Sequence, residues 1–500
     1  MIFPKRKEFE KLVKKGNLIP VFCDVIADME TPVSAYYKIC NQKSSDTFAF
    51  LLESIEGGEN IARYSFLGIN PNSIFIQKDG KSEHIIGTEK IPINGCDVFD
   101  KINSVLKKYK PVSIPGLPPF IGGAVGYASY DIISEIEKTV ESPEASPYDL
   151  PEAFFMITDT VLAFDRVKHT IKVISQAYLG DDDDITKVYN TTVEKINKIV
   201  KLLKIPTVIP PVTINENAQA DANVDYLSNK TREEFYGMVN KTKQYIYDGD
   251  IIQAVLSQRF SIDSKVSPIA LYRALRMINP SPYMFLLNCG DFSVVGASPE
   301  VHAKCINRKI TVRPIAGTRK RGDTEEVDLA LEKELLDDPK ERAEHIMLVD
   351  LARNDVGRIA EAGSVKVNQL MTVEKYSHVM HIVSTINGIL DKKYESDHVM
   401  RSTFPAGTLS GAPKVRAMQI ISEQEKEKRG PYGGVVAYYS FDGNIDSCIT
   451  IRTAVIKNNK VFIQAGAGIV ADSDPITEYE ETQNKAKALI KAVSLANFFD

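Results

Sequence analysis

Tryptophan is absent from the 500 residues, and no apolar run approaches the ~18 residues that a membrane-spanning helix needs. The first 16 residues carry too many charges for a secretory signal peptide and are typical of an amphipathic helix instead. We therefore expect a protein that has no membrane contact. The lack of tryptophan decides nothing by itself.

Cysteine is scarce and scattered, at positions 23, 40, 96, 289, 305 and 448, with no C-x-x-C spacing. This spacing favours small buried thiols over a disulfide framework, and it predicts a reduced, cytoplasmic protein. An excess of positive charge is also missing, because 61 Lys and Arg face 66 Asp and Glu for a net charge of −5. We expect no nucleic-acid partner.

The composition is otherwise that of a globular protein, and the length predicts two to four domains. Residues 205–224 carry three prolines followed by polar residues, which predicts a linker between region 1–204 and region 225–500. In the second region, short strands are joined by turns as often as by helices. Ser228 and Asn229 could cap a helix over 232–247. These patterns predict an α+β fold with antiparallel sheets.

Two acid pairs share one spacing. Glu341 and Glu344 lie on a predicted helix over 341–358, and Glu478 and Glu481 lie on a helix that Asp474 and Pro475 can start. Two acid-faced helices that meet across a cleft would hold a hard cation such as Mg²⁺. The alternative is two solvated helix faces.

Two small-residue stretches could present backbone amides to a ligand. Residues 404–414 run into a helix, an arrangement that binds anions, although the spacing is not that of a Walker A loop. Residues 464–471 fit G-x-G-x-x-A. We reject a dinucleotide site there, because another loop precedes the next helix and no βαβ unit surrounds it.

Three single residues stand out from their surroundings. Arg452 lies in an apolar strand, so its partner is either a protein acid or a ligand carboxylate. His381 lies among apolar residues and is either a core histidine or a proton-transfer group. Glu300 ends a strand and is either an exposed loop acid or a general acid.

Taken together, these segments resemble component I of the anthranilate synthases, within the chorismate-utilising enzyme family. The resemblance covers nearly the whole chain and rests on several motifs in the family's order. They are GASPE, RPIAGTR, EHIMLVDLARNDVGR, FPAGTLSGAPK, GPYGG, IRTA, GAGIVADSDP and EYEETQNKA.

The resemblance implies stacked antiparallel sheets with helices outside, and an Mg²⁺-dependent lyase that converts chorismate and ammonia to anthranilate and pyruvate. Glu344 and Glu481 resemble direct Mg²⁺ ligands, and Glu341 and Glu478 resemble outer ligands that act through water. Glu300 resembles the general acid, and His381 resembles the group that assists elimination. The resemblance implies substrate contacts for Tyr432, Arg452, Gly466, Ala467, Gly468, Thr408, Gly411 and Lys485.

Two positions separate this activity from related ones. Relatives that add water carry a lysine base where Gln253 stands, and ammonia needs no such base. The aminodeoxychorismate synthases, which are the alternative assignment, carry a reactive lysine where Ala316 stands. Both residues favour anthranilate as the product.

The resemblance also implies regulation and a partner. Glu53 and Ser54, together with Pro282, Tyr283 and Met284, resemble a feedback site for L-tryptophan, the end product of the pathway that this step would commit. None of the cysteines lies in a G-x-C-x-G turn, so a separate glutamine amidotransferase subunit is implied, in a heterotetramer. The lack of tryptophan suits an enzyme made when tryptophan is scarce.

Overall fold

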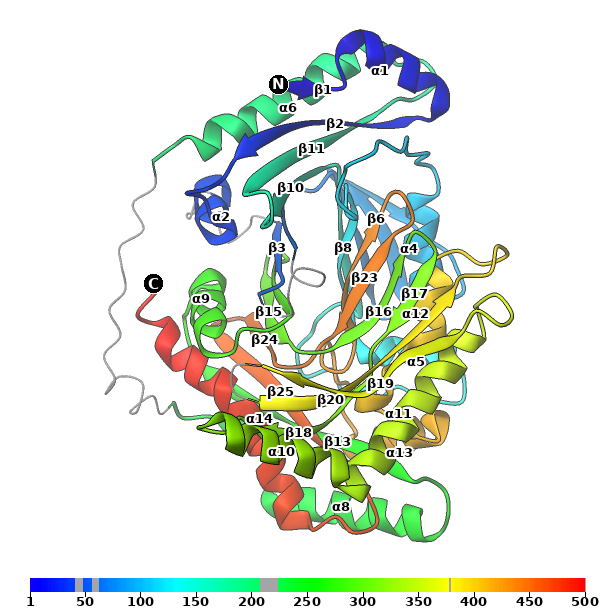
Figure 1. Ribbon diagram of the computed structural model, residues 1–500, viewed down its shortest axis with the longest axis vertical. Coiled ribbons are helices and arrows are strands. Elements are labelled where there is room, and N and C mark those ends of the chain that lie inside the picture. Colours follow the sequence, from blue (N-terminus) through cyan, green and yellow to red (C-terminus); the bar gives the residue numbers. More distant parts are fainter. Residues whose placement is uncertain (41–47, 56–62, 207–223, 377–378, 500) are drawn as a thin grey trace.

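The computed structural model describes residues 1–500 except 41–47, 56–62, 207–223, 377–378 and 500, and it contains two large sheets (Figure 1). In the first sheet the strands lie in the order β1 (Ile2–Phe3), β2 (Leu18–Ile26), β11 (Thr170–Tyr178), β10 (Thr160–Asp165), β4 (Tyr64–Ile69), β3 (Ala49–Glu53), β14 (Tyr283–Asn288), β15 (Phe292–Ser298), β24 (Thr453–Lys457), β25 (Lys460–Ile469), β13 (Gln253–Asp263) and β12 (Leu227–Ser228). β21 (Gly411–Ala412) pairs with β13.

The second sheet has the order β18 (Ile315–Lys320), β20 (Val379–Ile389), β17 (Lys309–Val312), β16 (Val301–Ile306), β23 (Ile445–Ile449), β22 (Val435–Ser440), β8 (Gly123–Ala128), β9 (Ala153–Thr158), β5 (Ser73–Lys78), β6 (Lys81–Ile86) and β7 (Glu89–Pro92). β19 (Lys366–Lys375) pairs with β20. The pairings of named strands are antiparallel in both sheets, so the predicted fold class is confirmed.

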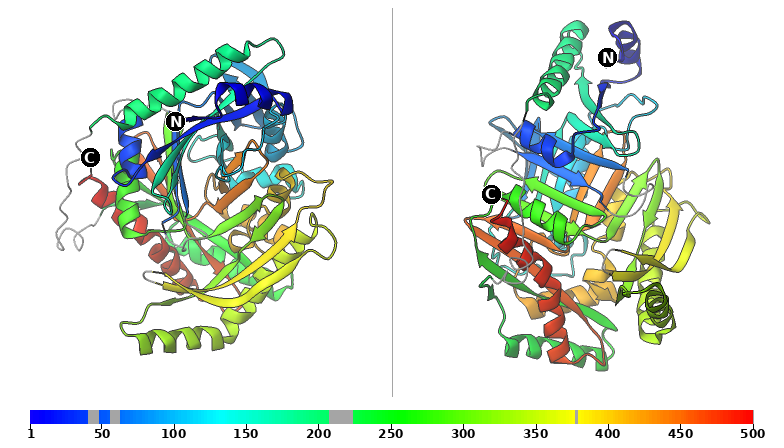
Figure 2. Two further views of the ribbon diagram at one scale, coloured as in Figure 1. Left: turned by 45° about the horizontal axis from the view of Figure 1, so that its top comes forward. Right: turned by 60° about the vertical axis from the view of Figure 1, so that its left-hand side comes forward.

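Helices pack on the outside of the sheets. They are α1 (Arg6–Leu12), α2 (Pro32–Cys40), α4 (Val98–Leu106), α5 (Ile133–Ile136), α6 (Ile185–Leu203), α8 (Arg232–Tyr247), α9 (Pro268–Ile278), α10 (Glu325–Asp337), α11 (Pro339–Gly357), α12 (Asp397–Thr403), α13 (Lys414–Glu425) and α14 (Pro475–Ala496). Figure 2 shows α14 along one side of the body, with α1 and α6 at the opposite end. Among the described helices none is long and apolar enough to cross a membrane.

The helix ends show how the sequence sets them. Asp474 caps α14 by accepting a hydrogen bond from the Thr477 amide, and Pro475 occupies its first turn, as predicted. α8 begins after Thr231, whose side chain and that of Glu234 form a reciprocal capping box. The expected cap at Ser228 and Asn229 is therefore wrong.

Strands from the two halves of the chain share both sheets. β3 pairs with β14 in the first sheet, and β8 pairs with β22 in the second. A buried cluster also crosses this join, where Phe50 and Phe120 pack with Phe285 and Tyr438. The division at 205–224 remains a prediction, and most of that segment lies outside the described residues.

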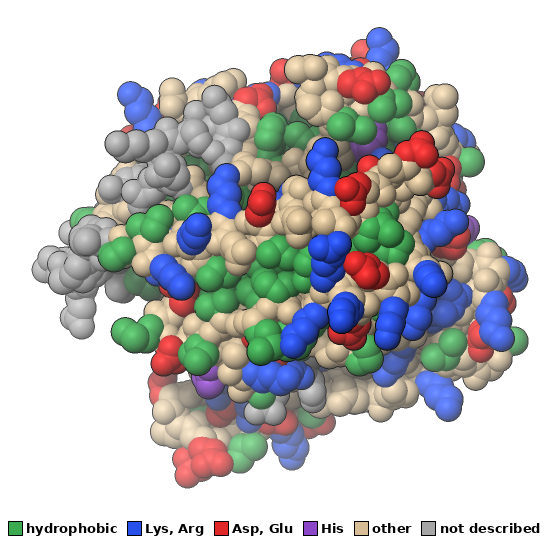
Figure 3. All heavy atoms as spheres, turned by 90° about the horizontal axis from the view of Figure 1, so that it is seen from above, with side chains coloured by type: hydrophobic (Ala, Val, Ile, Leu, Met, Phe, Trp, Pro, Cys, Tyr) green, Lys and Arg blue, Asp and Glu red, His purple; other side chains and the backbone are tan. Residues whose placement is uncertain are grey.

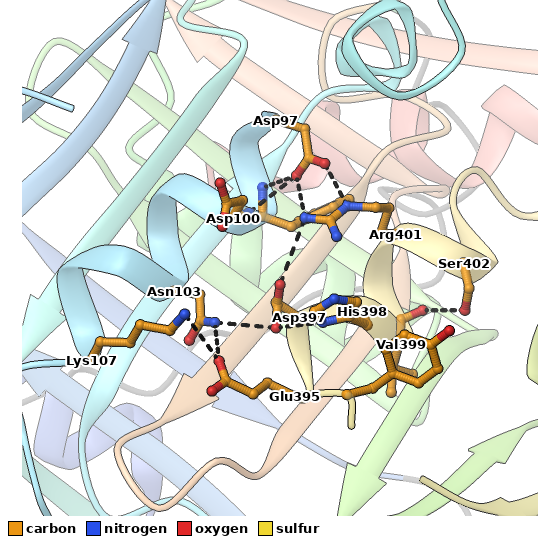
Figure 4. Close-up of polar contacts among 12 residues, drawn as sticks. Asp97, Asp100, Asn103, Lys107, Glu395, Asp397, His398, Val399, Arg401 and Ser402 are labelled. Atoms are coloured by element: carbon orange, nitrogen blue, oxygen red, sulfur yellow. Dashed lines mark hydrogen bonds and ion pairs between the residues drawn. The ribbon is translucent and has the colours of Figure 1, made fainter. Parts of the chain in front are cut away.

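A polar network ties α4 to α12 across the same join (Figure 4). Asp97 caps α4 and also binds the Arg401 guanidinium of α12, with 2.5 Å between Oδ2 and Nε. Asn103 donates to Glu395 over 2.7 Å. Because Asp97 is buried, its ion pair has little exposure to solvent screening, and it helps to fix the two halves relative to each other.

The surface and the thiols have simple properties. All six cysteines carry free thiols, and Cys23, Cys289, Cys305 and Cys448 are buried. The face seen from above mixes acidic and basic side chains around a central hydrophobic area (Figure 3).

Candidate active site

The two predicted acid pairs face each other from α11 and α14. Burial raises the pKa of Glu344, and the charges of Glu341 and Glu481 raise it further. Burial likewise raises the pKa of Glu478, with a contribution from Glu481. Glu344 and Glu481 are 137 residues apart in the chain, yet their carboxylates interact electrostatically in one site.

Protein cations occupy part of this acidic site. Arg319 pairs with Glu341 at 3.0 Å, and Lys485 pairs with Glu481 at 2.5 Å. Gln253 Nε2 lies 3.5 Å from Glu344 Oε1. Within the described ranges, no three His, Cys, Asp or Glu side chains lie close enough together to hold a metal.

Arg452 places a charged group with no protein partner beside these acids. Its backbone has φ of 51°, a left-handed value that is uncommon for a residue other than glycine. The Arg452 guanidinium is half-buried, and this burial lowers its pKa. The negative charges of Glu481 and Glu300 act in the opposite direction and raise it. Among the described residues its guanidinium has no ion pair or hydrogen bond, so the sequence alternative of a structural acid partner is not observed.

Tyr432 and residues 466–468 form a wall near Arg452. β24 stops pairing with β25 at Ala454↔Ile463, so the backbone of 466–468 has no described strand partner on that edge. A Cβ on Gly466 would lie 2.7 Å from the Tyr432 hydroxyl, and one on Gly468 would lie 2.5 Å from Gln253 Nε2. Only glycine leaves this space open.

Glu300 is buried and keeps a proton near neutral pH. Burial raises its pKa to about 7, although hydrogen bonds from Thr408 and the Ile315 amide and the Arg452 charge oppose the rise. Thr408 Oγ1 donates to Glu300 Oε1 over 2.9 Å. A carboxylic acid in this state can deliver a proton to a leaving group.

His381 is neutral at neutral pH. Burial lowers its pKa, and the Arg452 charge adds to this effect. Its Nδ1 lies 3.0 Å from both Gly317 O and Thr318 Oγ1, on strand β20 opposite β18. A neutral imidazole of this kind can accept a proton.

The loop at 404–414 is shaped by close packing. Gly411 has φ of 142°, and a Cβ there would lie 2.1 Å from Gln253 O. Lys414 is paired with Asp355 at 2.7 Å. Lys485 Nζ bonds Gly466 O at 3.0 Å, so it connects the acids to the wall at 466–468.

The sequence analysis did not identify two arginines that hold the elements around the site in place. Arg319 pairs with Glu334 and Asp338 as well as Glu341, and so anchors α10 and α11 beside the site. Arg429 is 1% exposed, pairs with Glu425 and donates to two backbone carbonyls, while its guanidinium lies 5.6 Å from the Tyr432 ring centroid. The available signal was that Arg319 ends the RPIAGTR motif and that Arg429 directly precedes GPYGG.

The five predicted feedback residues line one cavity at the β3–β14 join. They are Glu53, Ser54, Pro282, Tyr283 and Met284. The pairing of β3 with β14 causes this, because it sets Met284 opposite Glu53. We call this the seam cavity.

The seam cavity contains polar atoms that the protein leaves unused. Glu53 Oε2 accepts a 2.6 Å hydrogen bond from Tyr272 and pairs with Arg276 at 3.3 Å. Glu53 Oε1 and Ser54 Oγ are buried and have no hydrogen-bond partner in the part of the chain that the structure describes. Orphaned buried polar atoms are costly, and a bound polar ligand would satisfy them.

The site and fold together define a class of protein. A family model described as chorismate binding enzyme matches residues 47–491. The chain belongs to this family of chorismate binding enzymes.

Within the family, two relatives named anthranilate synthase component 1 match the whole length. The protein of Synechocystis sp. is 45% identical and that of Acetivibrio thermocellus is 46% identical, each over 99% of both chains.

Solved structures agree. Anthranilate synthase component I from Streptococcus pneumoniae has a TM-score of 0.77 at 35% identity and covers 93% of this chain and 98% of its own. The menaquinone-specific isochorismate synthase of Escherichia coli has a TM-score of 0.70 at 16% identity, over 98% of this chain and all of its own, which shows the shared fold alone.

Proposed function

We propose that the protein is an anthranilate synthase large subunit, which converts chorismate and ammonia to anthranilate and pyruvate in the first committed step of L-tryptophan biosynthesis. The observation that carries this proposal is the unpartnered Arg452 guanidinium beside the buried acid Glu300. Full-length similarity to relatives of that name supports it.

The substrate carries two carboxylates, and the site offers matching groups. Arg452, the Tyr432 hydroxyl and the open backbone edge at 466–468 would bind the enolpyruvyl carboxylate. Gly411 would allow close approach of the ring.

Glu300 and His381 would carry out the proton transfers of the reaction. Ammonia bonds to the ring while Glu300 protonates the departing ring hydroxyl, which leaves as water, and the new ammonium group returns a proton to solvent. Thr408 orients the Glu300 carboxyl. His381 assists the second step, in which the ring loses a proton, the bond between the ring and the enolpyruvyl oxygen breaks, and the departing group takes up a proton to leave as pyruvate.

Mg²⁺ suits the donor set, because Glu344 and Glu481 offer hard oxygen ligands from two facing helices, and burial together with neighbouring negative charges raises the pKa of Glu344. Glu344 and Glu481 would bind it directly, and Glu341 and Glu478 through water. When bound, Mg²⁺ would offset the charge of the substrate's ring carboxylate beside these acids.

Gln253 and Ala316 support ammonia as the nucleophile and anthranilate as the product. Gln253 cannot act as the base that activates water. Ala316 cannot form a covalent adduct with the ring, which disfavours an aminodeoxychorismate synthase. The ammonia would come from a separate glutamine amidotransferase subunit in a cytoplasmic heterotetramer.

The seam cavity is proposed to bind L-tryptophan as a feedback inhibitor. Glu53 would bind the ammonium group, Ser54 would add a hydrogen bond, and Pro282, Tyr283 and Met284 would contact the indole. The unused Glu53 Oε1 and Ser54 Oγ support this assignment.

Ammonium salts replace the amidotransferase in a direct test. The purified chain with chorismate, Mg²⁺ and ammonium at alkaline pH should give fluorescent anthranilate. A 4-amino product would instead indicate an aminodeoxychorismate synthase. Tryptophan binding without turnover, measured by calorimetry, would indicate a regulatory subunit that lacks activity.

A further inference from the structure

A small cavity adjoins the candidate active site and shares Glu300 and Thr408 with it. It has about 40 Å³ of space open to water, and its lining includes Glu300, His302, Asp355, Thr403 and Thr408. A buried water needs ≳10–15 Å³ measured in this way, so the cavity has room for water beside the general acid.

His302 presents an unused hydrogen-bond acceptor in this lining. It lies in β16, two residues after Glu300, where the pairing with β23 is irregular between Val301 and Ala303, and both residues line the cavity. Ser447 Oγ donates its hydrogen to Ala303 O over 2.7 Å, and His302 Nδ1 lies 3.2 Å from the same oxygen. His302 Nδ1 therefore carries the hydrogen and donates it. Nε2 keeps its lone pair and is buried, and no described residue forms a hydrogen bond to it.

The other charged groups around the cavity are already paired. Asp355 of α11 binds Lys414 of α13, and Arg313 binds Glu374 of β19. Burial lowers the pKa of His302 to about 3, with a smaller opposing effect from the Thr403 carbonyl, so the ring is neutral. Within the described ranges, Glu300 Oε2 and His302 Nε2 therefore both lack a protein hydrogen-bond partner, and both residues line the cavity.

We propose that His302 is a positioning residue, which holds a water in this cavity so that the water can return a proton to Glu300 after each turnover. This inference rests on the proposed function, in which Glu300 gives one proton to the departing hydroxyl. The water forms a new O–H bond to Glu300 as its own O–H bond breaks. Solvent protonates the oxygen of this water at the same time, so no free hydroxide forms, and this proton balances the one released by the new ammonium group.

His302→Leu removes the acceptor, and it should affect the single-turnover rate and the steady-state rate differently. The first turnover starts with a protonated Glu300 at about pH 6.5, so in single-turnover fluorescence it should match the parent enzyme. Later turnovers wait for reprotonation, so the steady-state rate should fall about tenfold. His302→Gln keeps a side-chain acceptor and should recover most of the rate.

A matched control is His84→Leu, which removes another buried histidine, one whose Nε2 is satisfied by Ser73 at 2.7 Å. It should leave both phases unchanged. Equal slowing of first and later turnovers in His302→Leu, or no slowing of either, would overturn the proposal. If the unsubstituted protein makes no anthranilate, the proposed function fails instead, so the two failures are distinguishable.

Discussion

The candidate active site and the seam cavity both use acids, yet they hold them differently. Glu481 in the active site has a side chain that is 43% exposed, and its partner Lys485 is also partly exposed. Glu53 in the seam cavity has a fully buried side chain and is fixed by Tyr272 and Arg276 of α9. An exposed acid can exchange its partner for a substrate or a cation, whereas a buried one is set in place before the ligand arrives.

This difference indicates separate demands. Under the proposed function, the active site has to release its product, and its exposed acid Glu481 is paired with the partly exposed Lys485. The seam cavity would only have to recognise one inhibitor, and a preorganised acid does this at a small entropic cost. Substitutions in the first site should therefore reduce the rate, and substitutions in the second should change inhibition alone.

The largest loss is expected for Glu300→Gln. The amide keeps the shape but cannot donate a proton to the leaving hydroxyl, so kcat should fall by about 10³-fold. Steady-state anthranilate fluorescence measures this. A variant within tenfold of the parent would contradict the general-acid role, and Glu300→Asp should retain more activity than Glu300→Gln.

The same residue should affect stability in a pH-dependent way. Its pKa is about 7 in the folded protein and 4.5 without burial, so the folded state holds the extra proton between these values. Stability contributed by Glu300 is therefore present below pH 4.5 and lost as pH rises to 7, by up to about 3 kcal/mol. Urea unfolding measured at pH 4.5 and at pH 7 checks this. Relative to the parent, Glu300→Gln should have a higher free energy of unfolding at pH 7 than at pH 4.5.

Glu481→Gln should lower activity about 100-fold while the fold persists, because a proposed direct Mg²⁺ ligand is lost. The variant should need a higher Mg²⁺ concentration than the parent to reach its maximal rate. Glu480→Gln is the control, since this neighbour on α14 is exposed and outside the site. Equal activity of the two variants would remove Glu481 from the metal assignment.

Ser54→Phe tests the seam cavity. The ring would occupy space that tryptophan needs, and overpacking of this kind costs about 1–3 kcal/mol, so inhibition should weaken tenfold or more. The uninhibited kcat should not change. Calorimetry and inhibition assays together check this, and unchanged inhibition would count against tryptophan as the ligand.

The sequence predicted individual elements better than their assembly. The helix predicted over 341–358 is α11 (Pro339–Gly357), because periodic apolar residues and Gly357 mark its extent. The interleaving of strands from both halves was not predictable, because strand order depends on long-range pairing that local patterns do not encode. The resemblance brought together the acids, Arg452 and the seam residues. Arg319 lies in one of its motifs, RPIAGTR, but only the geometry shows that it pairs with Glu334, Asp338 and Glu341.

The smallest effect is expected where the two sites connect. Tyr283 of the seam cavity pairs with Ser298 across the β14–β15 hairpin, and Ser298 donates to Ile449 O over 2.6 Å. The Ile449 amide in turn donates to Glu300 O over 3.1 Å. Two hydrogen bonds therefore link the seam strand to the general acid.

Ser298→Ala should keep tryptophan binding and basal turnover near normal, but should weaken their coupling about two- to fivefold. Ser293→Ala is the matched control, because Ser293 lies on the same strand and instead bonds Asn288 at its far end. Tryptophan affinity with and without chorismate gives the coupling directly. If both variants leave that ratio unchanged, inhibition passes by another route, and the contrast between the buried Glu53 and the exposed Glu481 would have to be explained without this hairpin.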